Sequence, residues 1–111
     1  MRKSHPETPD GRYFVAKGRL WRKTDPRLDD STRRAAVKRL MKARRDVSQA
    51  QTEADESDAR ARVDAAKQAL GERGPVWWDD GAPDESRKAP WTSSYAEWWA
   101  SLPQDQRDEA T

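Results

Sequence analysis

The chain has 111 residues, enough for one small domain. Leu, Val, Ile and Phe together account for 11 of them, well below the roughly 20% under which chains tend toward disorder, so an aliphatic core cannot hold a fold of this size. Six Trp and two Tyr supply the missing apolar area, because each buried aromatic ring system removes roughly 150–250 Å² from water. The composition therefore predicts an aromatic core.

The composition also excludes several kinds of chemistry. There is no Cys, which rules out disulfides, thiolate nucleophiles and Cys-based zinc sites and fits a reducing cytoplasm. The single histidine, His5, lies in a polar leading segment, so a folded Ser-His-acid or Cys-His site is not expected. No stretch approaches the ~20 apolar residues of a membrane helix, and the first residues lack the apolar region of a signal peptide. We therefore expect a soluble cytoplasmic protein that is not an enzyme, with no cofactor, no metal and no membrane contact.

The net charge of +2 hides a strong asymmetry along the chain. Residues 1–45 hold 15 Lys or Arg against 5 Asp or Glu, whereas residues 46–111 hold 7 against 15. Two interpretations follow: the two halves attract each other in the folded chain, or the basic half is a surface for nucleic acid. The first is favoured, because a domain that binds free polyanions usually keeps a larger net positive charge.

In chain order, residues 1–11 have almost nothing to bury and are expected to form a disordered lead before a single domain over residues 12–102. The stretch RYFVAKGRLWRK predicts a β-hairpin that turns at Lys17-Gly18. That register places Phe14 opposite Trp21 and Val15 opposite Leu20. An isolated hairpin is marginal, so its apolar face is expected to rest on the helices that follow.

A basic helix is predicted from Ser31 to about Gln51, with Asp29 or Asp30 as its N-cap. Its apolar positions recur at helical spacing and predict one buried face: Ala36, Val37, Leu40, Met41, Val47 and Ala50. Residues 31–47 also carry seven basic side chains, which repel one another unless acids lie alongside: Arg33, Arg34, Lys38, Arg39, Lys42, Arg44 and Arg45.

A second helix should follow, because acids that suit a helix start precede an apolar stripe that ends at Leu70 and Gly71. The acids are candidates for pairing with the basic helix. We therefore predict an antiparallel two-helix hairpin with its turn near residues 52–57. No Gly or Pro marks that turn, so one continuous helix of about forty residues is the alternative.

The remaining segment is rich in tryptophan and in turn residues. Trp77 and Trp78 are expected to turn the chain back over the hairpin, one buried and one partly exposed. Ser94 and Glu97 resemble a capping box for a short helix, which Pro103 ends before a disordered tail over residues 103–111. One aromatic face is predicted on that helix, made of Tyr95, Trp98, Trp99 and Leu102. The fold class is thus α+β, mainly α, with an N-terminal β-hairpin, an antiparallel helical hairpin and a Trp-rich C-terminal wrap.

Three stretches, RYFVAKGRLWRKTDPRL, LMKARRDV and VDAAKQALGERGPVWWDDGAPD, resemble a family of small bacterial proteins of unknown function, sometimes labelled biopolymer transporter Tol. The resemblance covers about residues 11–99, and the run from Ala69 to Asp84 is its most specific part. It implies a small bacterial protein, with no catalytic residues to carry over. This chain departs from the family pattern at Ser86, where the pattern has Asn, and at Ser94, where it has Pro.

Non-catalytic binding is the function that the residues favour. The carboxylates Asp79, Asp80, Asp84 and Glu85 lie in a Gly/Pro-rich stretch and are interpreted as turn residues rather than catalytic ones. Nine large aromatics exceed what so short a domain encloses, which favours a protein-interaction adaptor with an unknown protein partner. The alternative is a nucleic-acid-binding accessory protein that uses helix 31–47 with exposed aromatics; a homo-oligomer is a further alternative. The candidate basic surface is Arg33, Arg34, Arg39, Lys42 and Arg45, and the candidate aromatic surface is Trp77, Trp78, Trp98 and Trp99.

Overall fold

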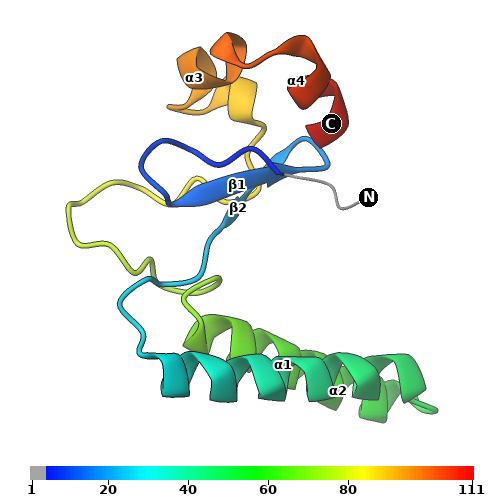
Figure 1. Ribbon diagram of the computed structural model, residues 1–111. Helices are drawn as coiled ribbons and strands as arrows, with labels where there is room; N and C mark the ends of the chain where they lie inside the picture. The colour runs from blue at the N-terminus through cyan, green and yellow to red at the C-terminus, as the bar shows by residue number, and fades with distance from the viewer. Residues whose placement is uncertain (1–4) are drawn as a thin grey trace. The chain divides into compact units, whose positions relative to one another are not determined.

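The computed structural model describes residues 5–111 and confirms an α+β, mainly helical fold (Figure 1). An N-terminal β-hairpin is followed by two longer helices and then by a segment with three short helical pieces. In chain order the elements are β1 (Tyr13–Ala16), β2 (Arg19–Arg22), α1 (Asp30–Gln49), α2 (Glu53–Ala69), the 3-10 helix η1 (Pro90–Thr92), α3 (Ala96–Ser101) and α4 (Gln104–Ala110).

The chain divides into two compact units, where the sequence predicts a single domain over residues 12–102. The strand unit comprises Met1–Lys23 and Asp80–Thr111, and the helical unit comprises Thr24–Asp79. Each unit combines a basic segment with an acidic one and is close to neutral: the helical unit has 12 Lys or Arg against 11 Asp or Glu. The charge asymmetry along the chain is therefore balanced inside each unit.

The β-hairpin has the predicted turn and register. β1 and β2 are antiparallel, with Phe14 opposite Trp21 and Val15 opposite Leu20. Lys17 has φ 54° and Gly18 φ 72°, which are the two positive φ angles of a type I′ turn. One side of the hairpin is buried, made of Tyr13, Val15, Leu20 and Arg22.

The β-hairpin belongs to a different unit from α1 and α2, the helices that were expected to support its apolar face. The hairpin groups with residues 80–111 rather than with the helices that follow it in sequence. The amide of Leu20 donates to the carbonyl of Lys88 (2.9 Å), and the carbonyl of Leu20 accepts from the amide of Arg87 (2.7 Å). A two-stranded sheet leaves such edge groups unpaired, so a returning segment of chain satisfies them.

Part of the predicted disordered lead is ordered. Residues 1–4 lie outside the described residues, but Glu7 forms an isolated antiparallel bridge with Phe14, and Thr8 is buried. The amide of Val15 donates to the carbonyl of Pro6 (2.9 Å), and the amide of Thr8 donates to the carbonyl of Tyr13 (2.9 Å). The edge of β1 opposite β2 thus pairs through backbone hydrogen bonds with residues 6–8, a segment that has little apolar side-chain area of its own.

The predicted disordered tail is helical. Residues 104–110 form α4, and Ala110 is buried. The carbonyl of Ala110 accepts a hydrogen bond from the amide of Gly18 at the β-turn (2.7 Å). A polar sequence is ordered here because its backbone and one small side chain find partners in the strand unit.

The antiparallel helical hairpin is confirmed, and the continuous helix is excluded. Asp29 caps α1 by accepting from the amide of Thr32 (2.7 Å), and Thr52 caps α2 by accepting from the amide of Asp55 (3.0 Å). The turn therefore occupies residues 50–52, and residues 53–57 belong to the first turns of α2 instead of the predicted turn. Acids in those first turns are favoured by the positive end of the helix dipole.

The helices pack through small side chains. The buried cluster is Ala36 and Leu40 of α1 with Ala66 and Leu70 of α2 and its C-cap, and Leu28, Val37 and Val63 are packed against it. Met41, predicted to be buried, is 45% exposed because it lies about 140° round the helix from Ala36. Ala43 is buried in its place.

α2 ends at Gly71 as predicted. Gly71 has φ 78°, its amide donates to the carbonyl of Gln68, and the amide of Glu72 donates to the carbonyl of Lys67, both at 3.0 Å. These two bonds form a Schellman motif, which reverses the chain direction after a helix. The reversal brings Arg73 alongside α2, where its guanidinium lies 3.2 Å from Asp64.

Candidate interaction surfaces

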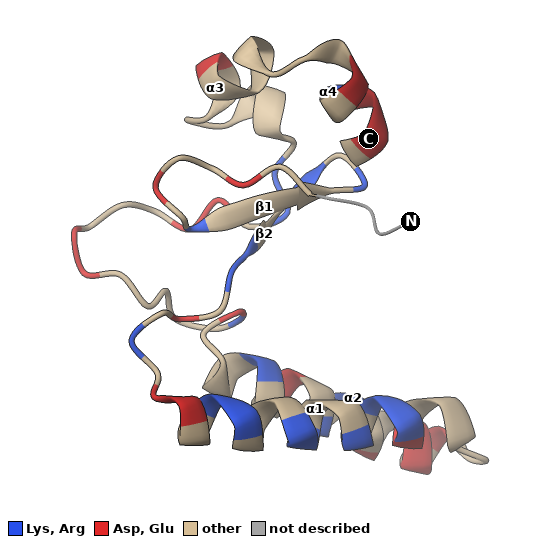
Figure 2. Ribbon diagram, viewed as in Figure 1, with Lys and Arg blue, Asp and Glu red and all other residues tan. Residues whose placement is uncertain are grey.

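The side of α1 away from α2 carries a basic strip with one apolar residue in it. Arg34, Lys38, Met41 and Arg45 recur at intervals of four, three and four residues, so they share one helix face. All four are exposed, as is the neighbouring Lys42. Figure 2 shows the basic residues gathered along α1. We call this set the outer strip of α1: Arg34, Lys38, Met41, Lys42 and Arg45.

Few of the basic residues of α1 are neutralised by ion pairs. Arg33 pairs with Asp30 within the first turn (2.9 Å), and Lys42 pairs with Asp46 one turn on (3.1 Å). Within residues 5–111, four basic side chains of α1 make no ion pair: Lys38, Arg39, Arg44 and Arg45. Two of the predicted surface residues, Arg33 and Arg39, project to the sides of α1, and Lys38 joins the strip in addition.

The acids at the start of α2 pair within their own helix. Glu56 binds Arg60 (3.0 Å), and Asp58 binds Arg62 (3.2 Å). We expected acids of α2 to pair with basic residues of α1. In the described chain the ion pair that links the two helices instead joins a basic residue of α2, Arg62, to an acid of α1, Asp46 (2.7 Å). The hydrogen bond from Arg62 holds the pKa of Asp46 below its usual value, and Lys42 adds to the effect. Among the described residues, the acids of α2 therefore make no ion pair with the outer strip, whose Arg34 and Lys42 pair only with Asp30 and Asp46 of α1 itself.

The tryptophans proposed as an aromatic surface are largely core residues. Trp78 and Trp99 are buried, at 8% and 6% exposure, while Trp77 and Trp98 are half-buried. Trp77 and Trp78 meet edge to face with ring centroids 5.2 Å apart. Their exposures confirm the prediction of one buried and one partly exposed ring. These four residues do not form an exposed aromatic surface.

Trp91 is the aromatic residue that sequence reasoning did not single out. Its ring is 51% exposed, and its centroid lies 6.0 Å from that of Trp99. It belongs to η1 in the strand unit, where the edge of the ring lies close to Gly18. A single Trp that follows Pro90 in a segment of turns carries no periodic signal, so the sequence offered no means of finding its exposure.

The proposed capping box is wrong, because Ser94 makes a different contact. The N-cap of α3 is Tyr95, and no side chain caps the helix. The amide and hydroxyl of Ser94 both donate to the buried carboxylate of Glu85, at 2.9 and 2.5 Å. A buried carboxylate needs such donors, so Ser94 and Glu85 tie α3 to the returning segment.

The carboxylates of Asp80 and Asp84 in the turn-rich stretch also have structural partners. Asp80 accepts from Arg12 and from the amide of Ala82 (3.0 Å), and Asp84 accepts from the amide and hydroxyl of Ser86. The amide of Glu85 donates to the hydroxyl of Tyr13 (2.8 Å). The hydrogen bond from Arg12 is the main cause of the lowered pKa of Asp80. These contacts agree with the interpretation of the stretch as turns.

A pair of tyrosines links the lead to α3. The hydroxyl of Tyr95 donates to the carboxylate of Asp10 (2.6 Å), and its ring meets that of Tyr13 edge to face at 5.5 Å. Burial and the neighbouring Asp10 carboxylate raise the pKa of Tyr95 far above its usual value. Tyr95 therefore stays protonated and remains a hydrogen-bond donor at physiological pH.

No protein-family profile, curated protein or solved structure matches the chain. The resemblance to small bacterial proteins of unknown function therefore stays a prediction. In the part of the chain that the structure describes, no helix is both long and apolar enough to cross a membrane. Over the same residues, no group of three or more His, Cys, Asp or Glu side chains is placed to hold a metal ion.

Proposed function

We propose that the chain is a non-catalytic adaptor whose helix α1 docks an acidic segment of a protein partner. The observation that carries the proposal is the outer strip of α1, in which exposed basic side chains surround an exposed Met41. Basic side chains set electrostatic complementarity and speed encounter with an acidic surface. A flexible, polarisable methionine in their midst suits contact with an apolar side chain.

Met41 and the tryptophans favour a protein partner over nucleic acid. A phosphate backbone offers nothing apolar for a methionine at the centre of a basic strip. Binding of single strands relies on exposed rings that stack on bases, yet in the helical unit Trp78 is buried and Trp77 half-buried. Nucleic acid therefore remains the alternative outcome of the test rather than the proposal.

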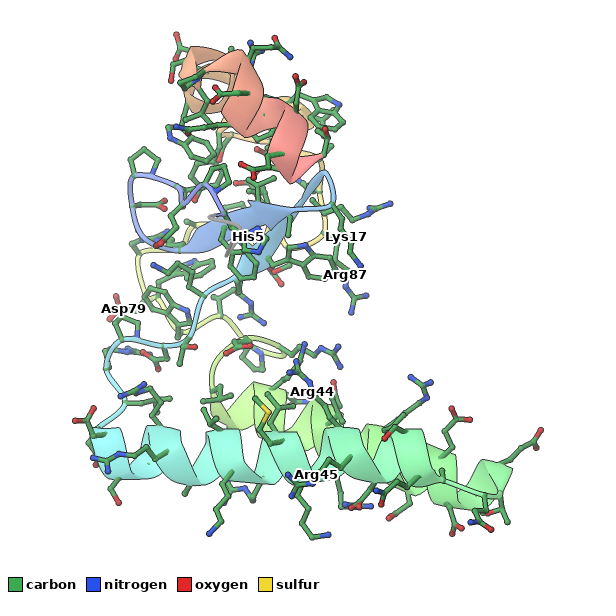
Figure 3. All side chains as sticks on the ribbon, turned by 45° about the vertical axis from the view of Figure 1, so that its right-hand side comes forward. His5, Lys17, Arg44, Arg45, Asp79 and Arg87 are labelled. Carbon is green, nitrogen blue, oxygen red and sulfur yellow. The ribbon has the colours of Figure 1, made fainter. Side chains whose placement is uncertain are left out.

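The test compares two matched double variants in affinity purification of the tagged full-length chain, with and without nuclease. Lys38→Gln/Arg45→Gln removes two charges that make no ion pair in the described structure from the outer strip. The control, Lys17→Gln/Arg87→Gln, removes two exposed charges from the strand unit; both residues likewise make no ion pair in the described chain (Figure 3). Far-UV circular dichroism should be the same for all three proteins, because surface changes of this kind alter stability little.

A protein that co-purifies with the wild type and the control after nuclease treatment, but not with Lys38→Gln/Arg45→Gln, supports the adaptor. Replacing Met41 with Gln should then weaken the same association about tenfold, because an apolar contact is lost without a change of charge. If recovery disappears with nuclease, or if Met41→Gln has no effect while the charge variant abolishes binding, the surface binds polyanions and the adaptor proposal is wrong.

A further inference from the structure

One side of the helical hairpin contains an open cavity whose lining combines arginine and valine side chains. It has a volume of about 340 Å³, at the lower end of the range for small-ligand sites. Two valines, one from each helix, and three arginines line it: Val47, Val63, Arg44, Arg60 and Arg73. Arg44 comes from α1, Arg60 from α2, and Arg73 from the segment that the Schellman motif turns back along α2.

The three guanidinium groups keep hydrogen-bond donors available for a ligand. Arg60 is bound by Glu56 at 3.0 Å and Arg73 by Asp64 at 3.2 Å, each through one terminal nitrogen. Arg44 makes no ion pair with any residue in 5–111. Because a guanidinium has five N–H groups, a site with three of them and two carboxylates has both net positive charge and unused donors.

We propose that this cavity binds a small organic phosphate with a compact apolar body. Arginine forks match phosphate oxygens in geometry, and a phosphate monoester carries about −1.5 to −2 charge at neutral pH. Val47 and Val63 offer the body of the ligand an apolar surface, and none of the five lining residues is aromatic, so the lining presents no ring on which a nucleobase could stack. The site is separate from the outer strip of α1 and does not depend on the proposed partner.

Arg44 and Arg39 form a matched pair for the test. Both are exposed, belong to α1 and make no ion pair in the described chain, but Arg39 lies two turns before Asp46 on the side that bears the Arg62 ion pair. Figure 3 shows Arg44 and its neighbour Arg45 leaving α1 in different directions. Arg44→Gln and Arg39→Gln thus remove the same charge from the same helix, inside and outside the cavity.

The experiment titrates the ¹⁵N-labelled full chain with phenyl phosphate and, separately, with inorganic phosphate, by NMR. We expect saturable shifts at the amides of Val47 and Val63, and tighter binding of phenyl phosphate. Arg44→Gln should weaken binding at least about tenfold, Arg39→Gln less than about twofold, and Arg44→Lys should restore only part of the loss, because a lysine keeps the charge without the fork.

Three results would overturn the proposal. Shifts that do not saturate or that spread evenly along α1 indicate general attraction of anions. Equal losses in Arg39→Gln and Arg44→Gln indicate the same. Equal binding of inorganic and phenyl phosphate would show that Val47 and Val63 do not contact an apolar part of the ligand. Unchanged amide dispersion in the ligand-free variants shows that none of these results comes from unfolding.

Discussion

At the scale of single residues, Gly71 is the more crowded of the two glycines in the helical unit. Its φ of 78° is left-handed, and a Cβ added there would lie 2.9 Å from the Cβ of Asp25 and 3.1 Å from Cδ1 of Trp77. The same residue ends α2 and allows Trp77 to approach. Conformation and space therefore both demand glycine at this position.

We predict that Gly71→Ala destabilises the helical unit by about 2–5 kcal/mol. Left-handed backbone costs an L residue roughly 1–2 kcal/mol, and overpacking adds a further 1–3 kcal/mol. Hydrogen exchange of the α2 amides measures the loss. Gly81→Ala is the matched control: φ is 82° and no atom lies within 4 Å of the added Cβ, so its own unit should lose only the backbone cost. Equal losses in the two variants would show that crowding at Gly71 is relieved.

At the scale of elements, the caps decide where the helical hairpin turns. Neither Gly nor Pro occurs between the helices, yet the chain leaves α1 at Ala50 and re-enters a helix after Thr52. Thr52 adopts extended backbone, with φ −132° and ψ 160°, and its side chain satisfies the amide of Asp55. A good N-cap thus replaces the usual helix breaker.

Thr52→Ala should therefore destabilise the hairpin by about 1 kcal/mol, because the amide of Asp55 loses its partner. Thr52→Ser keeps the hydroxyl and should stay within a few tenths of a kcal/mol of the wild type. Urea unfolding followed by circular dichroism compares them. An equal loss in both variants would show that the threonine methyl group, rather than the cap, matters.

Sequence periodicity located these elements well, because each depends on local rules. The Lys17-Gly18 turn, the strand register, the Asp29 cap and the Gly71 stop follow from the residues at those positions. The exposure of Met41 does not follow from local rules. An apolar residue at the margin of a helical stripe is buried only if the partner helix is wide enough to cover it. A partner built on Ala59 and Ala66 is narrow.

At the scale of the whole molecule, hydrogen-bonded carboxylates stabilise both units. Donors from Arg62 lower the pKa of Asp46, and donors from Gln68 and Arg73 lower that of Asp64. In the strand unit, Arg12 lowers the pKa of Asp80. Burial alone would raise the pKa of Asp10, but hydrogen bonds from Tyr95 and Thr8 outweigh it, and the net shift is downward.

Both units should therefore lose stability in acid. A carboxylate whose pKa is lower in the folded chain contributes stability above its unfolded value, about 3.9, and loses it as pH falls through the folded value. We expect the thermal midpoint to fall from about pH 5 downward. Asp46→Asn should flatten this dependence for the helical unit, as seen in the exchange of its amides, and leave the strand unit unchanged. A midpoint that does not vary with pH over this range would contradict the assignment.

The candidate surfaces were predictable only in part. The basic helix is visible in the sequence as seven Lys and Arg side chains, and its three outermost predicted residues, Arg34, Lys42 and Arg45, lie on the exposed face. The aromatic surface was not predictable. The composition predicts an aromatic core with some rings left accessible, and Trp78 and Trp99 are indeed buried, but nothing in the sequence indicates that Trp91 is the exposed ring.

The sequence by itself determined the β-hairpin turn and register, the start of α1 and the end of α2, because caps, turn glycines and hydrophobic spacing act within a few residues. Only the tertiary structure decided which segments share a core. Residues 87–88 form backbone hydrogen bonds with the edge of β2, and the carbonyl of Ala110 accepts from the amide of Gly18 in the β-turn. The chain, predicted to be one domain with disordered ends, therefore divides into two units, each nearly neutral. Such pairing depends on backbone groups that every residue carries, and therefore leaves no signature in the amino-acid sequence.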